Sequence, residues 1–75
     1  METEIKILKI LEKQMNQSEI LEKLKRKEKY RPFLIRVLQR MEKQNWIESF
    51  KGQDKRFKLY SRIEKGDKLL KIWKN

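Results

Sequence analysis

The spacing of the apolar residues changes after Asn45, and this change limits the possible folds more than any other feature. Up to Asn45 the apolar residues recur three or four positions apart, which is the spacing of one face of an α-helix. After Asn45 two stretches alternate β-prone and polar residues, as half-buried strands do. The sequence therefore predicts an α+β fold that is mostly α.

Signals for helix ends divide the first part of the chain into three helices. They are expected over residues 3–13, 17–25 and 31–44. Thr3 and Asn16 can cap the first two, because their side-chain oxygens can accept hydrogen bonds from free backbone N–H groups. Pro32 fits the first turn of the third helix, and Asn45 can end that helix in the left-handed conformation.

Two strands and a fourth helix are predicted after Asn45. The strands are expected over residues 46–51 and 57–62, with a polar tip between them, and the helix over residues 64–73. An isolated hairpin is marginal, so this one has to pack against the helices. We expect its aromatic residues to fill the core, with base stacking on a single-stranded nucleic acid as the alternative: Trp46, Phe50, Phe57 and Tyr60.

The chain of 75 residues contains no Cys and no His. It is expected to form a single domain over residues 1–75, without a disulfide, a metal site or a cofactor. A domain of this size has a small core, and oligomerisation is the remaining way to bury more apolar surface. The absence of His, Cys and a glycine-rich phosphate loop argues against an enzyme.

Membrane insertion and secretion are not expected. No apolar run approaches the ~20 residues that cross a bilayer, and the acidic N-terminus Met1-Glu2-Thr3-Glu4 differs from a secretory signal. A cytoplasmic, nucleoid-associated protein is therefore expected. The high content of Lys, Glu and Ile favours a thermophilic source, such as an archaeon or one of its viruses.

Positive charge is concentrated in the middle of the sequence. The net charge is +10, from 21 Lys and Arg against 11 Asp and Glu. Residues 30–62 carry 9 basic and 3 acidic groups, and therefore supply +6 of the +10. This clustering favours a polyanionic partner, and general solubility of a Lys-rich surface is the alternative.

Three segments resemble winged helix-turn-helix transcription regulators of the MarR and PadR type: 17–21, 32–42 and 45–47. The run Lys55-Arg56-Phe57-Lys58-Leu59-Tyr60, followed by Glu64-Lys65-Gly66 and Leu69-Leu70, is similar to their wing and closing helix. The resemblance covers about residues 5–72. It departs at Asn45, where the family often has Gly, and at Arg62 and Ile63, where an apolar residue and a capping Thr are usual.

The resemblance implies a winged helix-turn-helix fold with three helices, a two-stranded wing and a C-terminal helix. It also implies a sequence-specific double-stranded DNA-binding transcription regulator, with a repressor as the expected role. The recognition helix, about 31–44, would enter the major groove, and the wing, 51–58, would lie on the backbone or in the minor groove. An RNA-binding or ribosome-associated winged helix and a protein–protein interaction module are the alternatives.

The helical spacing orients the expected recognition helix. If Leu34, Leu38 and Met41 face the core, a step of about 100° per residue places Arg36 and Lys43 on the opposite face. Base contacts are expected from Arg31, Ile35, Arg36 and Gln39. Backbone contacts are expected from Lys29, Arg40 and Lys43, and from the wing residues Lys51, Lys55, Arg56 and Lys58.

The first and last helices carry more apolar residues than a core of this size is expected to absorb. These residues are assigned to a homodimer interface: Ile5, Ile7, Ile10, Leu69, Ile72 and Trp73. A two-fold axis would place two recognition helices ~34 Å apart, over a palindromic site.

Overall fold

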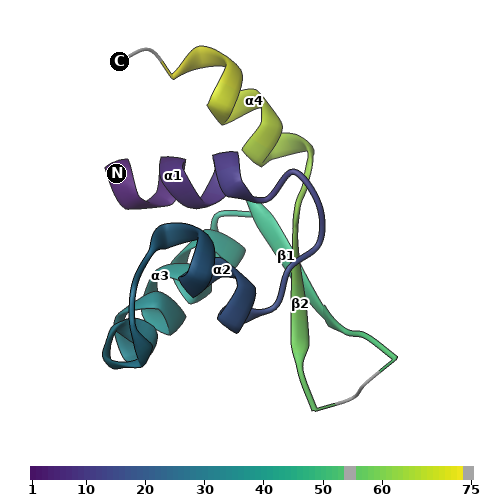
Figure 1. Ribbon diagram of the computed structural model, residues 1–75. Coiled ribbons are helices and arrows are strands. Elements are labelled where there is room, and N and C mark those ends of the chain that lie inside the picture. The colour runs from purple at the N-terminus through teal and green to yellow at the C-terminus, as the bar shows by residue number, and fades with distance from the viewer. Residues whose placement is uncertain (54–55, 74–75) are drawn as a thin grey trace.

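The computed structural model describes residues 1–53 and 56–73. The elements follow the order α1 (Glu2–Ile10), α2 (Gln17–Leu24), the short 3-10 helix η1 (Glu28–Tyr30), α3 (Arg31–Lys43), β1 (Ile47–Lys51), β2 (Lys58–Arg62) and α4 (Glu64–Ile72). The predicted mostly helical α+β fold is confirmed. Figure 1 shows the β1–β2 hairpin reaching away from the helices, with α1 and α4 at the other end. Within the described ranges, no helix has the length and apolar character of a bilayer-spanning segment.

Helix α2 begins and ends at local signals. The Asn16 side chain accepts from the backbone N–H of Glu19 at 2.8 Å, and the Glu19 carboxylate accepts from the backbone N–H of Asn16 at 2.9 Å. This reciprocal capping box satisfies two N–H groups that the helix itself leaves free. Lys25, at φ 58°, ends the helix in the left-handed conformation. The predicted cap at Asn16 is confirmed.

Helix α3 also keeps its predicted ends. Pro32 lies in the first turn, where its missing N–H costs no helical hydrogen bond. Asn45 adopts φ 61°, and the backbone N–H of Trp46 donates to the carbonyl of Met41 at 3.0 Å. This left-handed stop redirects the chain from α3 into β1.

The predicted ends of α1 are wrong at both sides. The helix starts at Glu2, because the backbone N–H of Ile5 already donates to the carbonyl of Met1, so Thr3 lies inside the first turn and caps nothing. It stops at Ile10 instead of Lys13. The Arg62 side chain donates to the Leu8 carbonyl at 2.6 Å and thereby satisfies a group at the end of α1.

The two strands pair antiparallel, with Ile47 opposite Arg62 and Lys51 opposite Lys58. The segment between α1 and α2 lies along the other edge of β2, where Met15 and Tyr60 exchange two backbone hydrogen bonds of 3.1 and 2.8 Å. At Tyr60, strand β2 therefore has hydrogen-bonded neighbours on both sides. These bonds fix the hairpin against the helices, as its expected marginal stability requires.

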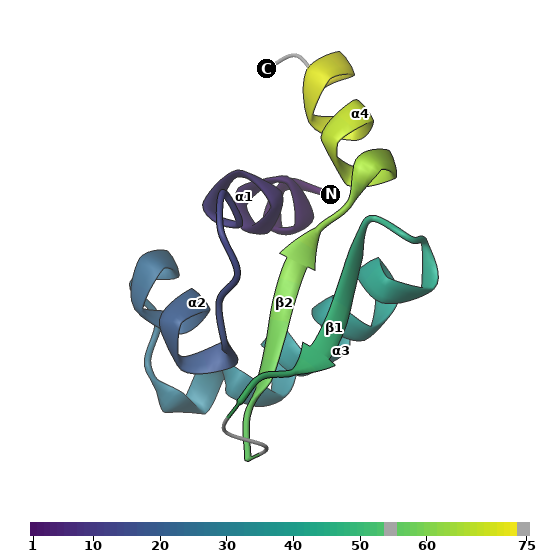
Figure 2. The ribbon, with the colours of Figure 1, turned by 90° about the vertical axis from the view of Figure 1, so that its right-hand side faces the viewer.

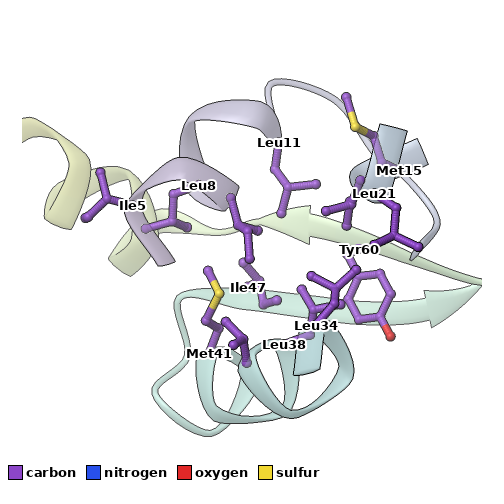
Figure 3. Close-up of a cluster of buried hydrophobic side chains, with 13 residues drawn as sticks. Ile5, Leu8, Leu11, Met15, Leu21, Leu34, Leu38, Met41, Ile47 and Tyr60 are labelled. Carbon is purple, nitrogen blue, oxygen red and sulfur yellow. The ribbon is translucent and has the colours of Figure 1, made fainter. Parts of the chain in front are cut away.

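The core lies between the helices and the inner face of the hairpin (Figure 3). It is built from buried apolar side chains of α1, α2, α3, both strands and the α1–α2 connection: Ile5, Ile7, Leu8, Leu11, Met15, Ile20, Leu21, Leu34, Val37, Leu38, Met41, Ile47 and Tyr60. All the apolar positions expected to anchor α3 are among them.

The expectation that the core cannot absorb the α1 isoleucines is wrong. Ile5 and Ile7 are 3% and 0% exposed within the chain itself, because α2 and α4 both pack against α1 and cover two sides of it. Ile10, Leu69 and Trp73 are half-buried against the core. Ile72 is 73% exposed. Of the six residues assigned to a homodimer interface, Ile10, Leu69, Ile72 and Trp73 therefore keep exposed surface that a second copy of the chain could bury.

The hairpin aromatics divide between core and surface. Tyr60 is buried and Trp46 is half-buried against the core, as expected. Phe50 and Phe57 are 37% and 50% exposed, so the prediction that they fill the core is wrong. Successive side chains of a strand point to opposite faces, and Phe50 lies on the face opposite to the inward-pointing Ile47.

The junction between β2 and α4 is closely packed. A Cβ atom on Gly66 would lie 2.2 Å from the carbonyl oxygen of Trp46, so α4 passes directly over the start of β1. The Arg62 guanidinium pairs with Asp67 in α4 while it also bonds the Leu8 carbonyl. Arg62 therefore links the wing strand to both α1 and α4.

Candidate nucleic-acid interface

The outer side of α3 forms an open, basic groove. Its inner side is fully covered, because Leu34, Val37, Leu38 and Met41 are at most 1% exposed. The groove is lined by Phe33, Arg36, Gln39, Arg40 and Lys43. All five are exposed, so the predicted orientation of the helix is confirmed.

Arg31 occupies a different position from the other predicted base-contact residues. Its guanidinium donates twice to Glu28, at 2.8 and 2.6 Å, and also to Gln17 at 3.0 Å and Ser18 at 2.9 Å. The hydrogen bond between the two charged side chains holds the pKa of Glu28 below its usual value and raises the pKa of Arg31. Gln17 in turn donates to the Tyr60 hydroxyl at 3.0 Å. Arg31 thus fixes the start of α3 against the start of α2.

The two edges of the α3 groove are held by other elements. Arg40, whose side chain is 66% exposed, lies 3.7 Å from the Glu4 carboxylate on α1. On the opposite edge, Ser49 of β1 donates to Glu42 at 2.9 Å and connects the hairpin to α3. Ile35 is half-buried, so only part of its side chain is available to a ligand.

Phe33 is a candidate that the sequence assignments omitted. It is 40% exposed in the first turn of α3, and its ring lies 5.0 Å from that of Tyr30. The Arg26 guanidinium lies 5.0 Å from the Tyr30 ring centroid and supports it from the loop before η1. The sequence contained a signal for this role, because Phe33 is an apolar residue on the otherwise polar side of the predicted helix.

A second hollow joins the start of α2 to the hairpin. It is lined by Asn16, Gln17, Ser18, Arg31, Arg56, Phe57 and Lys58. Arg56 and Lys58 therefore lie near the free backbone N–H groups of a helix N-terminus, which carries a partial positive charge. The sequence assignments treated the wing alone and did not include α2.

Three further predicted backbone-contact residues are exposed: Lys29, Lys51 and Lys58. Lys51 and Lys58 stand directly opposite each other in the hairpin, an arrangement that repels unless an anion lies between or near them. Lys29 shares a third basic hollow with Lys25, Arg26, Lys27 and Tyr30. Lys55 lies outside the described residues. Within the described ranges, no three Asp or Glu side chains gather as metal ligands would.

Comparison with known proteins identifies the fold. No protein-family model matches the chain, and no curated protein matches it. Among solved structures, a mutant of Lactococcus lactis ZitR in its apo form aligns with a TM-score of 0.80 and 29% identity, over 93% of this chain and 52% of that one. A mutant of E. coli MarR complexed with operator DNA aligns with a TM-score of 0.82 and 21% identity, over 92% and 49%.

A third neighbour, a mutant of S. aureus MepR, aligns with a TM-score of 0.80 and 23% identity, over 92% of this chain and 51% of that one. All three are MarR-family winged-helix regulators. The fold is the MarR-type winged helix. In it, α2 and α3 form the helix-turn-helix and β1–β2 forms the wing. The chain spans about half the length of these neighbours. The PadR-like part of the resemblance stays a prediction.

Proposed function

We propose that this winged helix binds double-stranded DNA sequence-specifically and regulates transcription, with α3 in the major groove. The observation that carries the proposal is the division of α3 into a fully buried face and an open basic face. An α-helix fits the major groove, and the N-terminal part of a recognition helix meets the base edges. The operator complex of E. coli MarR, which shares the fold, supports the same use here.

Each residue of the α3 groove suits a different part of the duplex. Arg36 can donate two hydrogen bonds to guanine, and Gln39 can pair with adenine. Phe33 and Ile35 are the apolar residues that can contact a thymine methyl group. Arg40 and Lys43 lie farther along the helix, where phosphate contacts are expected. Arg31 is assigned a positioning role, because its donors already hold α2 and η1.

The hollow between α2 and the wing is proposed to hold the DNA backbone. Arg56 and Lys58 would contact phosphates together with the N-terminus of α2, which favours anions. Lys51 would relieve its repulsion from Lys58 by binding a phosphate as well. Lys29 and Lys55 are proposed as further backbone contacts.

A homodimer is proposed through α4. Ile72 is exposed there, and Leu69 and Trp73 are half-buried. Ile10, which the sequence also assigned to the interface, lines the hollow between α1 and α2 instead. The indole N–H of Trp73 is buried without a hydrogen-bond partner among the described residues. A dimer that blocks a promoter would act as a repressor on the nucleoid.

Sedimentation tests the homodimer. The wild-type protein should sediment as a dimer, and Ile72→Glu should convert it into a monomer. A wild-type monomer at tens of micromolar would contradict the proposal.

Selection from random duplex DNA tests the DNA-binding proposal. On the selected sequence, Arg36→Ala should weaken binding by about 10- to 100-fold, and random DNA should be affected far less. Lys58→Ala is the matched control for a phosphate contact. It should weaken all sequences alike and reduce the slope of log K against log salt by about one. Equal effects of both variants on every sequence, or preference for RNA, would contradict the proposal.

A further inference from the structure

Helices α1 and α2 leave a shallow groove between them that the proposed DNA contacts do not use. In Figure 2 the two helices lie on the left, and α3 lies on their other side, behind the strands. Five lysines line the two adjoining hollows of this α1–α2 groove: Lys6, Lys9, Lys13, Lys23 and Lys25. Ile10 and Leu24, both half-buried, line it between the lysines.

The positive charge of the α1–α2 groove is not neutralised by ion pairs among residues 1–53 and 56–73. All five lysines are exposed, and none of them forms an ion pair with any residue of the described ranges. Glu12 is the acidic residue among those that line the hollows. Like charges gathered along one groove raise its potential and attract an anionic partner.

The groove is separated from the hollow between α2 and the wing, and it meets the hollow of Lys29 at Lys25. The DNA-facing hollow contains the N-terminus of α2, at Gln17 and Ser18. The α1–α2 groove contains the other end of the same helix, at Lys23 to Lys25. A duplex held by α3 and the wing therefore leaves the α1–α2 groove open to a second ligand.

We propose that the α1–α2 groove binds an acidic amphipathic helix of a partner protein. A duplex would satisfy the lysines through its phosphates but would leave Ile10 and Leu24 without an apolar contact. An acidic amphipathic helix covers both features, because its apolar side chains pack into the groove while flanking carboxylates meet the lysines. Binding there would tether the partner to DNA-bound protein.

The test uses a synthetic helical peptide with Leu along one face and Glu on both sides of it. Affinity is measured by fluorescence anisotropy, and the site is mapped by changes in backbone amide NMR shifts. The protein variant Lys6→Glu/Lys23→Glu is compared with Lys65→Glu/Lys71→Glu, which makes the same change in net charge on α4. Two further peptides replace Leu by Gln or Glu by Gln and leave the protein unchanged.

Shift changes confined to residues 6–13 and 20–25 are expected. Lys6→Glu/Lys23→Glu should lower the affinity about 10-fold, and the α4 variant should lower it no more than about 3-fold through its net charge alone. Both altered peptides should bind more weakly, and saturating duplex should not displace the original peptide.

Five results would overturn the proposal. Four of them are the absence of peptide binding at low salt, shift changes on α3 instead of the groove, equal losses of affinity in the two double variants, and equal binding of the Leu→Gln peptide. The fifth concerns duplex DNA. If duplex DNA shifts the groove amides of an Arg36→Ala/Lys43→Ala variant, the groove is a second nucleic-acid surface instead. None of these results bears on sequence-specific DNA binding through α3, which the duplex selection tests separately.

Discussion

Gly66 is a residue whose identity is set by a single backbone contact. A Cβ atom there would lie 2.2 Å from the Trp46 carbonyl oxygen and 3.1 Å from a Leu8 methyl carbon. The carbonyl belongs to the chain turn into β1 and also accepts from the Ile63 N–H at 3.2 Å, so it cannot move freely. The usual gain in helix propensity from Gly to Ala is therefore reversed at this position.

Gly66→Ala is expected to lower the free energy of unfolding by about 1–3 kcal/mol, as overpacking does in close-packed interiors. Lys65→Ala, at an exposed position in the same turn, is the control and should change it by less than about 0.5 kcal/mol. Urea unfolding of both variants measures the difference. Equal stability of the two would show that α4 does not pass over Trp46 as closely as described.

Phe33 and Ile35 offer two alternative contacts to thymine, and the DNA can distinguish them. The thymines of the selected duplex are replaced by deoxyuridine one at a time, and each replacement removes one methyl group. Loss of a buried methyl contact should weaken binding by about 0.8 kcal/mol, or roughly 4-fold in affinity. Phe33 is the more exposed of the two, so we expect it to make the contact. One thymine should then show the loss of affinity with the wild-type protein and with Ile35→Ala. The Phe33→Ala variant, which lacks the contact, should bind the two duplexes equally. The reverse pattern would assign the contact to Ile35.

At the scale of single elements, α2 depends most on its cap. It has eight residues, and short helices are marginal without support at their ends. Asn16 and Glu19 provide that support at the N-terminus, beside the hollow that also contains Lys58. The cap therefore stabilises both the helix and the proposed phosphate site.

Asn16→Ala should lower the free energy of unfolding by about 1 kcal/mol, the usual effect of removing a capping side chain. Gln14→Ala, an exposed change just before the cap, should have little effect. Thermal unfolding followed by circular dichroism gives both values. A loss equal to that of Gln14→Ala would mean that the reciprocal hydrogen bonds do not stabilise α2.

At the scale of the whole molecule, net charge affects stability and binding in opposite directions. The chain carries +10, and the Lys51–Lys58 pair and the α1–α2 groove both place like charges close together. Salt screens this self-repulsion, but it also weakens the attraction between the protein and a DNA backbone.

Raising the salt concentration from about 0.05 to 0.5 M should therefore raise Tm while it lowers affinity for duplex DNA, steeply if several phosphates are contacted. Differential scanning calorimetry and anisotropy in the same buffers measure the two effects. A Tm that falls with salt would mean that attractive ion pairs, such as Arg31–Glu28 and Arg62–Asp67, outweigh the repulsion.

The sequence by itself determined the features that depend on neighbours a few residues apart. The caps at Asn16 and Asn45, Pro32 in the first turn of α3 and the change from helical to strand spacing all depend on such local contacts. The inward face of α3 followed as well, because helical geometry fixes which residues share a side. The basic groove on its outer side could be predicted for the same reason.

Only the tertiary structure decided the features that depend on residues far apart in the chain. Ile5 and Ile7 are buried because α2 and α4 cover α1, and the Leu8 carbonyl at the end of α1 accepts a hydrogen bond from Arg62, 54 positions away. Arg31 is engaged by the start of α2, and Phe50 and Phe57 lie outside the core. Local spacing cannot specify these contacts, because they are set by how complete elements pack against one another.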